Sequence, residues 1–406
     1  MNYLILILLL LTGCENQADP MPDPKEDPSA LKVLWSEKLN PDSTTSFTGP
    51  IHINGDQLIF LNSYFKPHSL VQSRNIKTGK LNWTYDNPDL GELLGSKETV
   101  FSGNEVVINA HGHFYNINTI SGASSLIDKQ SGQGLGWPAE LMLFDNYLYC
   151  SNDESGVDDN FSNLVRRKIN GGEWENIFTE EKGSDGYSDG LNIPIITVQG
   201  LDTILLFANR MWHFANSKGR FDVMAYSLAG KKIKWKVDSI DPTGLGSSYP
   251  PIIYQGKVYF QGHHTLYCID IESGEQLWKF AMPEYLHTML QCQPLIADNK
   301  LFLKSNDVTL YALNPQTGIL DWKNEDTEYE TQKLQYANGM VMFTSHHYLL
   351  VINARTGQTI WKKKSPFEDA EANFNGWIPI GVNEKDSIIY ACDKKNIMAI
   401  KMPELK

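Results

Sequence analysis

Short runs of alternating apolar and polar residues make up most of the chain, and turn residues separate them. Residues 251–260 (PIIYQGKVYF) and 294–303 (PLIADNKLFL) each place a turn dipeptide, Gln-Gly or Asp-Asn, between two such runs. Period-two alternation is typical of strands with one buried face, and these dipeptides favour tight hairpin turns. The pattern therefore predicts short antiparallel strands throughout.

A tryptophan recurs along this pattern at intervals of about 40 to 60 residues, which is the size of a propeller blade. The series consists of Trp35, Trp83, Trp174, Trp235, Trp278, Trp322 and Trp361. The one longer interval, between Trp83 and Trp174, is divided by Leu126. These eight positions predict an all-β fold, an eight-bladed β-propeller whose blades are four-stranded antiparallel sheets.

Most of these tryptophans follow the same motif: Asn or Asp, two residues, Thr or Ser, Gly, three residues and Trp. Residues 75–83 (NIKTGKLNW) and 353–361 (NARTGQTIW) show it in full. Its glycine permits a positive φ in a tight hairpin, and its Asn or Asp can accept backbone N–H groups across the turn. We expect the tryptophan to lie on the following strand and pack over the hairpin. The motif glycines are Gly79, Gly122, Gly274, Gly318 and Gly357.

The two ends of the repeat region are complementary. Residues 31–39 (LKVLWSEKL) form a lone tryptophan strand, whereas only three strands follow Trp361. We therefore expect the N-terminal strand to complete the last blade and close the ring, which leaves no open sheet edge between the first and last blades.

The N-terminal segment carries targeting signals. The nine-residue apolar run from Tyr3 to Leu11 is too short to span a bilayer and fits the core of a signal peptide. Leu11-Thr12-Gly13-Cys14 resembles a bacterial lipobox, so we expect acylation of Cys14 and anchoring in a membrane. Residues 15–30 contain four prolines and five acidic residues, a composition typical of an extended tether. The predicted organisation is a signal peptide (1–13), an acidic Pro-rich tether (14–30) and a propeller (31–406).

The composition narrows the possible classes of function. The 406 residues include 35 Lys or Arg and 48 Asp or Glu, and the net charge of −13 disfavours a nucleic-acid partner. Only 20% of residues are charged and 11% are aromatic, as expected of a globular chain. No C-x-x-C, G-x-S-x-G or P-loop motif is present.

The hairpin motif resembles the tryptophan-docking repeats of the pyrroloquinoline-quinone (PQQ)-like β-propellers over residues 31–406. A lipoprotein of this length is most similar to the BamB-like outer-membrane assembly factors. The resemblance implies a non-catalytic scaffold for other envelope proteins, lipid-anchored at the outer membrane with the periplasmic or surface side left open, and without a cofactor. The same family contains quinone-dependent dehydrogenases, but these typically carry adjacent cysteines, whereas Cys150, Cys268, Cys292 and Cys392 are isolated. We expect these four to be small buried thiols.

Exposed aromatic residues are the candidate binding face, and a glycan- or peptide-binding propeller is the alternative function. Aromatics that only fill gaps between blades are the competing interpretation. The histidines His68, His111, His263 and His346 share one position, eleven residues before a hairpin glycine, and we interpret them as turn residues rather than metal ligands. The acidic insertion at 151–163 lacks calcium-loop spacing and is interpreted as a solvated loop. The candidate aromatic residues are Trp137, Trp212, Phe214, Tyr249 and Trp377.

Overall fold

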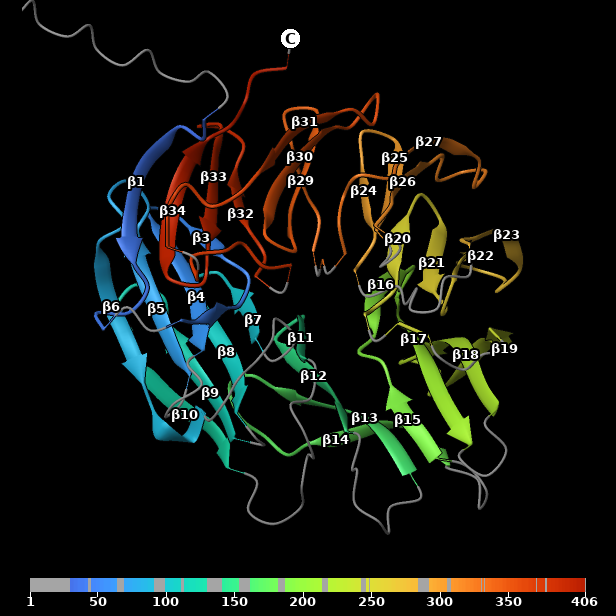
Figure 1. The fold of residues 1–406 in the computed structure, drawn as a ribbon. Coiled ribbons are helices and arrows are strands. Elements are labelled where there is room, and N and C mark those ends of the chain that lie inside the picture. The colour runs from blue at the N-terminus through green and yellow to red at the C-terminus, as the bar shows by residue number, and fades with distance from the viewer. Residues whose placement is uncertain are drawn as a thin grey trace, which may run out of the picture.

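Eight antiparallel β-sheets follow one another around a ring in chain order, and each sheet is one blade (Figure 1). The computed structural model describes residues 30–405, apart from 43–44, 64–68, 91–98, 111–112, 130–140, 153–160, 182–186, 214–217, 242–245, 248, 284–291, 305–307, 330, 332, 370 and 377. In each blade the first strand lies toward the centre and the fourth at the rim (Figure 1). The structure confirms the predicted eight-bladed, all-β propeller.

The strands of the first four blades are as follows. Blade 1 contains β2 (Phe47–Thr48), β3 (His52–Asn54), β4 (Gln57–Ser63), β5 (Leu70–Asn75) and β6 (Leu81–Asp86). Blade 2 contains β7 (Thr99–Ser102), β8 (Glu105–Ala110), β9 (His113–Asn118) and β10 (Ser124–Lys129). Blade 3 contains β11 (Leu141–Phe144), β12 (Tyr147–Asn152), β13 (Phe161–Lys168) and β14 (Glu175–Glu181). Blade 4 contains β15 (Tyr187–Leu191), β16 (Ile195–Gln199), β17 (Asp202–His213), β18 (Lys218–Ser227) and β19 (Lys232–Asp241).

The remaining blades have the same plan. Blade 5 contains β20 (Ile252–Tyr254), β21 (Lys257–Gln261), β22 (Thr265–Asp270) and β23 (Gln276–Ala281). Blade 6 contains β24 (Leu295–Ala297), β25 (Lys300–Lys304), β26 (Leu310–Leu313) and β27 (Leu320–Asn324). Blade 7 contains β28 (Gln335–Ala337), β29 (Met340–Ser345), β30 (Tyr348–Asn353) and β31 (Thr359–Lys363). Blade 8 contains β32 (Gly381–Asn383), β33 (Ile388–Cys392), β34 (Asn396–Lys401) and β1 (Val33–Lys38). A 3-10 turn, η1 (Pro88–Leu90), follows blade 1.

The N-terminal strand closes the ring, as predicted. β1 pairs antiparallel with β34, and the pairing runs from Val33 opposite Ile400 to Lys38 opposite Asn396. The fourth strand of the last blade therefore comes from the opposite end of the chain (Figure 1). Because this contact is non-covalent, closure of the ring depends on the free energy of side-chain packing and hydrogen bonding.

The inner strand is divided in two blades. In blade 1, β2 and β3 both pair with β4 and are separated by residues 49–51, which include Pro50. In blade 4, β15 and β16 both pair with β17 and are separated by residues 192–194, which include Pro194. Proline has no N–H to donate to the ladder, so it is tolerated at such interruptions of an edge strand.

Strand direction gives the ring two different faces. We call the side with the first-to-second and third-to-fourth turns of each blade the turn face. The side with the second-to-third turns and the connections between blades is the linker face. β1 begins at the turn face, because Val33 lies opposite the end of β34.

The apolar core consists of eight clusters, and each lies between two neighbouring blades. The cluster between blades 2 and 3 is the smallest, with Val107, Phe114, Leu141, Leu148 and Cys150 as its buried members. Stability therefore comes from contacts between sheets, so each blade needs both neighbours to bury its faces.

Five outer-strand tryptophans dock on the hairpin of the next blade, not on their own. A Cβ atom at Gly318 of blade 6 would lie 2.6 Å from the ring of Trp278 of blade 5. The motif glycine is therefore required twice, for its positive φ of 70° and for this close approach. The same contact joins Trp35 to Gly79, Trp83 to Gly122, Trp235 to Gly274 and Trp322 to Gly357.

A hydrogen bond completes most of these joints. The indole Nε1 of Trp35 donates to the carbonyl oxygen of Ile76 at 3.1 Å, and Trp83, Trp235 and Trp322 make the equivalent bond. At Trp278 the equivalent carbonyl, that of Pro315, instead accepts the hydroxyl of Tyr259 at 2.9 Å. The Trp278 indole N–H has no partner among the described residues.

Blade 3 departs from the tryptophan spacing. In blade 5, Trp278 lies opposite Cys268 at the position next to a strand bulge. In blade 3, the residue at the equivalent position is Phe178, which lies opposite Leu164 next to the bulge between β13 and β14. Trp174 precedes β14, and its ring lies 5.1 Å from Phe114 of the preceding blade. Phe178, not Trp174, is thus the structural equivalent of the docking tryptophans.

Candidate interaction surface

The second and third strands of blade 4, β17 and β18, are long and project from the linker face. β17 has 12 residues and β18 has 10, and they pair out to His213 opposite Lys218. The other second strands have 5 to 7 residues. At about 3.4 Å per residue, five extra residues extend β17 by roughly 17 Å. We call this projection, formed by the ends of β13, β14, β15, β17, β18 and β19, the wall.

Aromatic packing fixes the wall to blade 3. The ring of Phe178 in β14 lies 5.3 Å from Phe207 and 5.7 Å from Tyr226, both in edge-to-face geometry. Such pairs contribute about 0.5–1.5 kcal/mol beyond the area that they bury. The base of the wall is therefore a rigid platform rather than an isolated hairpin.

A buried carboxylate organises the wall above this platform. The side chain of Asp222 is fully buried, and its Oδ2 lies 2.9 Å from Arg220 and 3.3 Å from Lys236. Its Oδ1 accepts the backbone N–H of Ser239 at 2.8 Å, in a bulge where Ser239 has a φ of 52°. A buried charge needs such partners, because an unpaired one is strongly destabilising.

The same cations reach across to blade 3. Glu180 of β14 lies 3.5 Å from Lys236 and 3.9 Å from Arg220. Burial alone would lower the pKa of Lys236, but the carboxylates of Glu180, Asp238 and Asp222 hold it above its usual value. The joint between blades 3 and 4 is therefore partly ionic.

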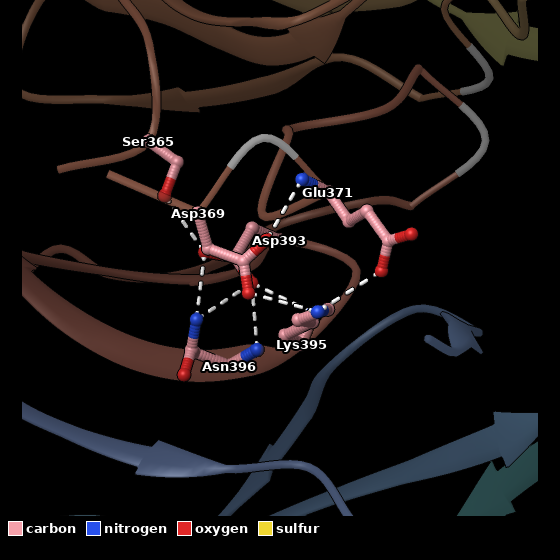
Figure 2. A network of polar contacts seen from close by, with 6 residues as sticks. All are labelled: Ser365, Asp369, Glu371, Asp393, Lys395 and Asn396. Atoms are coloured by element: carbon pink, nitrogen blue, oxygen red, sulfur yellow. Dashed lines mark hydrogen bonds and ion pairs between the residues drawn. The ribbon is translucent and has the colours of Figure 1, made fainter. Parts of the chain in front are cut away.

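A second polar network lies at the linker side of blade 8 (Figure 2). The buried carboxylate of Asp393 accepts the backbone N–H groups of Lys395 at 2.8 Å and Asn396 at 2.6 Å. It also accepts the hydroxyl of Ser365 at 2.7 Å and the side-chain amide of Asn396 at 3.1 Å. The turn between β33 and β34 is thereby tied to the segment that follows blade 7.

This turn also holds the N-terminal segment. The carbonyl oxygen of Lys395 accepts the backbone N–H of Leu39 at 2.9 Å, directly after β1. The Lys395 ammonium lies 2.8 Å from Asp369 and 3.0 Å from Glu371, and Figure 2 shows it among these acidic side chains. Its hydrogen bond to Asp369 lowers the pKa of that carboxyl group. We interpret the network as a clasp for the closing strand rather than a site of chemistry.

The structure describes only part of the predicted aromatic binding face. Trp137, Phe214 and Trp377 lie outside the described residues, as does the lipidation candidate Cys14. Residues 211–213 form the end of β17, so Trp212 lies in the wall. Tyr249 precedes β20, and its carbonyl oxygen accepts the amide of Asn192. Trp212 and Tyr249 thus lie in different regions of the linker face.

The histidines and cysteines are part of the fold. His263 and His346 lie at turns between second and third strands, and each ring contacts the ring of the following histidine. His68 and His111 lie outside the described residues, and the described part of the chain holds no cluster of three potential metal ligands. Cys150, Cys268, Cys292 and Cys392 are buried, and burial raises the pKa of the last three to about 12.

Sequence reasoning missed the wall and its buried Asp222. The length of β17 could not be predicted from the sequence, because apolar and polar residues alternate only weakly over residues 202–213. Phe178 could have been identified by aligning β14 with its partner strand β13, instead of by the spacing between successive tryptophans. The described residues contain no helix long and apolar enough to cross a bilayer.

Comparisons with known proteins define the class of this propeller. Residues 219–400 match the family model described as outer membrane protein assembly factor BamB. Together with the docking repeats, this match supports the predicted resemblance to the PQQ-like β-propellers and to the BamB-like factors. No curated protein matches the chain by sequence.

Solved structures share the fold at low sequence identity. BamB from Moraxella catarrhalis is 14% identical, with a TM-score of 0.58, and the match covers 93% of this chain and 99% of that one. A europium-containing methanol dehydrogenase is 8% identical, with a TM-score of 0.65 and coverage of 93% and 94%. Sqt1 from Saccharomyces cerevisiae is 11% identical, with a TM-score of 0.63 and coverage of 92% and 100%. At these identities the likeness shows the fold alone, which serves both enzymes and binding proteins.

Proposed function

We propose that this protein is a non-catalytic scaffold of the bacterial cell envelope, anchored to the outer membrane through lipidated Cys14. The observation that carries the proposal is the match of residues 219–400 to the family of the assembly factor BamB. The lipobox and the acidic tether of the sequence support it, because together they place a globular domain at a membrane surface. The partner is then another envelope protein.

The wall is the surface that we propose for this partner. It projects from the linker face, and its base is held by Phe178 and by the ion pairs around Asp222. A rigid projection loses little conformational entropy when it binds, which favours association. Its end contains Met211 and Trp212, and aromatic residues are common at the energetic centre of interfaces.

Site-specific cross-linking tests the proposal. A photoreactive amino acid at Met211 should capture a defined envelope protein in intact cells, and the adduct should remain after mild solubilisation. The matched control places the same group at Leu126, which is half-exposed on the outer strand of blade 2, away from the wall. Equal capture at both positions, or at neither, would contradict the wall as the binding surface.

The anchor has its own test. A Cys14→Ser variant with an ordinary signal-peptidase site should be exported in soluble form, because the acyl chains supply most of the membrane affinity at about 0.8 kcal/mol per buried CH₂. If this variant still sediments with membranes in high salt, the propeller itself binds an integral partner tightly.

Two other functions give different results in simple assays. A glycan-array signal that is lost on Trp212→Ala would support a ligand-binding propeller. Alcohol- or sugar-dependent dye reduction after addition of calcium and quinone would support a quinoprotein dehydrogenase. The scaffold proposal expects neither signal.

A further inference from the structure

The exposed apolar side chains of the propeller gather on one face. Of the exposed large hydrophobic residues among those described, Tyr329 lies at the linker face and Leu126 near the middle of an outer strand. The others lie in turns of the turn face or close to the strand ends beside it. They are Leu34, Leu81, Ile120, Val198, Leu201, Ile233, Leu277, Ile319, Leu320 and Leu405.

Three of these residues stand at turn positions where the corresponding residues of other blades are hydrophilic or small. Leu201 is fully exposed as the second residue of a two-residue turn, where blade 1 has Asp56 and blade 6 has Asn299. A leucine there buries nothing, so it contributes nothing to folding. Its presence needs an explanation outside the folded chain.

The other two positions follow the same rule in the third-to-fourth hairpins. Ile120 is 58% exposed two residues after the motif Asn, where blade 7 has Arg355. Ile319 is 66% exposed directly after the motif glycine, where blade 1 has Lys80. Comparison of the repeats within this one chain therefore marks both residues as exceptions.

The arrangement of the three tips is regular. Ile120 belongs to blade 2, Leu201 to blade 4 and Ile319 to blade 6, so neighbouring tips are a quarter of the ring apart. The fourth quarter is blade 8, where the chain enters β1 at the same face. Three apolar points and one attachment point on one side of a ring suit a flat partner better than a narrow pocket.

The attachment point identifies this flat partner. Residues 15–30 join β1 to Cys14, so the tether of the proposed lipoprotein leaves from the turn face. When an apolar tip enters the boundary between lipid headgroups and acyl chains, its transfer out of water is favourable. Exposed basic side chains such as Lys77, Lys231 and Arg355 lie in other turns of the same face, among acidic ones, so this face has mixed charge.

We propose that the turn face rests on the lipid surface that holds the anchor, with Ile120, Leu201 and Ile319 touching the bilayer. This inference rests on the proposed lipid anchor. It also explains the position of the wall, because the wall then projects away from the membrane, toward partners in the adjacent compartment. The tips orient the molecule, whereas the acyl chains retain it.

Fluorescence from single labelled sites tests this orientation. The full-length lipidated protein would carry one new cysteine, Leu201→Cys, labelled with an environment-sensitive dye. The native thiols Cys150, Cys268, Cys292 and Cys392 are at most 1% exposed and should not react. Ile120→Cys and Ile319→Cys are parallel sites, and Tyr329→Cys is the control on the opposite face, where the side chain is 43% exposed.

The labelled proteins would be reconstituted into vesicles of phosphatidylethanolamine and phosphatidylglycerol. We expect the dye at the three turn sites to shift to shorter wavelength and to be quenched about twofold or more by spin-labelled lipid, with no change at the Tyr329 site. Equal signals at all four sites from a protein that floats with the vesicles would overturn the orientation while leaving the anchor intact. Protection of the turn sites only after addition of membrane proteins would assign this face to a protein partner and would also overturn it. A lipidated protein that does not float would remove the anchor and the inference together.

Discussion

The closing joint of the ring can be tested by removing one side chain. Trp35 of β1 packs against Gly79 of blade 1, donates its indole N–H to Ile76 and lies 6.0 Å from Tyr390 of blade 8. It therefore contacts blade 1, which follows its own strand in the chain, and the C-terminal part of blade 8, with which β1 is paired only non-covalently. Trp35→Ala removes all of these contacts without shortening the chain.

The magnitude follows from the contacts. Replacing a packed Trp by Ala typically costs about 3–5 kcal/mol, and the indole hydrogen bond accounts for roughly 1 kcal/mol of this. Because Trp35 is only partly buried, we expect a loss of about 3 kcal/mol. Trp35→Phe should recover most of the packing but not the hydrogen bond, so it should cost about 1 kcal/mol.

Equilibrium unfolding in urea, followed by tryptophan fluorescence and circular dichroism, measures these changes. Trp83→Ala is the matched control, because Trp83 makes the same contact with Gly122, but its strand β6 is joined to β5 by a hairpin, whereas β1 pairs with β34 only non-covalently. Both variants should lose similar free energy, but only Trp35→Ala should separate the transitions seen by the two probes, since it opens the ring. A Trp35→Ala variant that unfolds within about 0.5 kcal/mol of wild type would refute the reasoning.

Three further predictions concern closure, pH and the thiols. Deleting residues 31–39 should expose the edge of β34 and produce aggregates in size-exclusion chromatography; a monomeric, cooperative variant would contradict this. Backbone hydrogen bonds from Ser273 and Glu272 lower the pKa of Asp270 in the folded state. The free energy of unfolding that the Asp270 carboxylate contributes is therefore fully present above its unfolded-state pKa, and it is lost as the pH falls through its folded-state pKa. Asp270→Asn should remove that share of acid sensitivity between about pH 5 and pH 2, and unchanged acid denaturation would argue against it. The Cys268, Cys292 and Cys392 thiols, whose pKa burial raises to about 12, should react with a thiol reagent at neutral pH only after unfolding, and labelling of the native protein would disprove their burial.

The fold could be predicted well because its information is local. The turn dipeptides have positive φ at both residues, and Gly256, Asp298 and Asn299, with φ of 74°, 49° and 55°, are of the types that adopt it most readily. Asp270 accepts the backbone N–H groups of Glu272 and Ser273 within its own hairpin, as its motif predicts. Such features depend on residues a few positions apart, so a sequence read without a structure can identify them.

The candidate site was harder to predict because it depends on register and strand length. The spacing of tryptophans placed Trp174 in the docking series, whereas strand pairing gives that role to Phe178. The paired length of β17 and β18 depends on side chains from blade 3 that stabilise their ends, including Glu180. No local pattern contains that contact.

The sequence by itself determined the number of blades, the hairpins and the strand that closes the ring, because each follows from alternation, glycine positions and the missing fourth strand. Only the tertiary structure decided that each docking tryptophan, such as Trp278, packs on the glycine of the next blade. It also decided that Asp222 is buried between two cations and that Leu201 shares a face with the start of β1. The physical reason is that packing between blades joins residues about 40 positions apart, and their contacts depend on the geometry of the closed ring rather than on the neighbouring sequence.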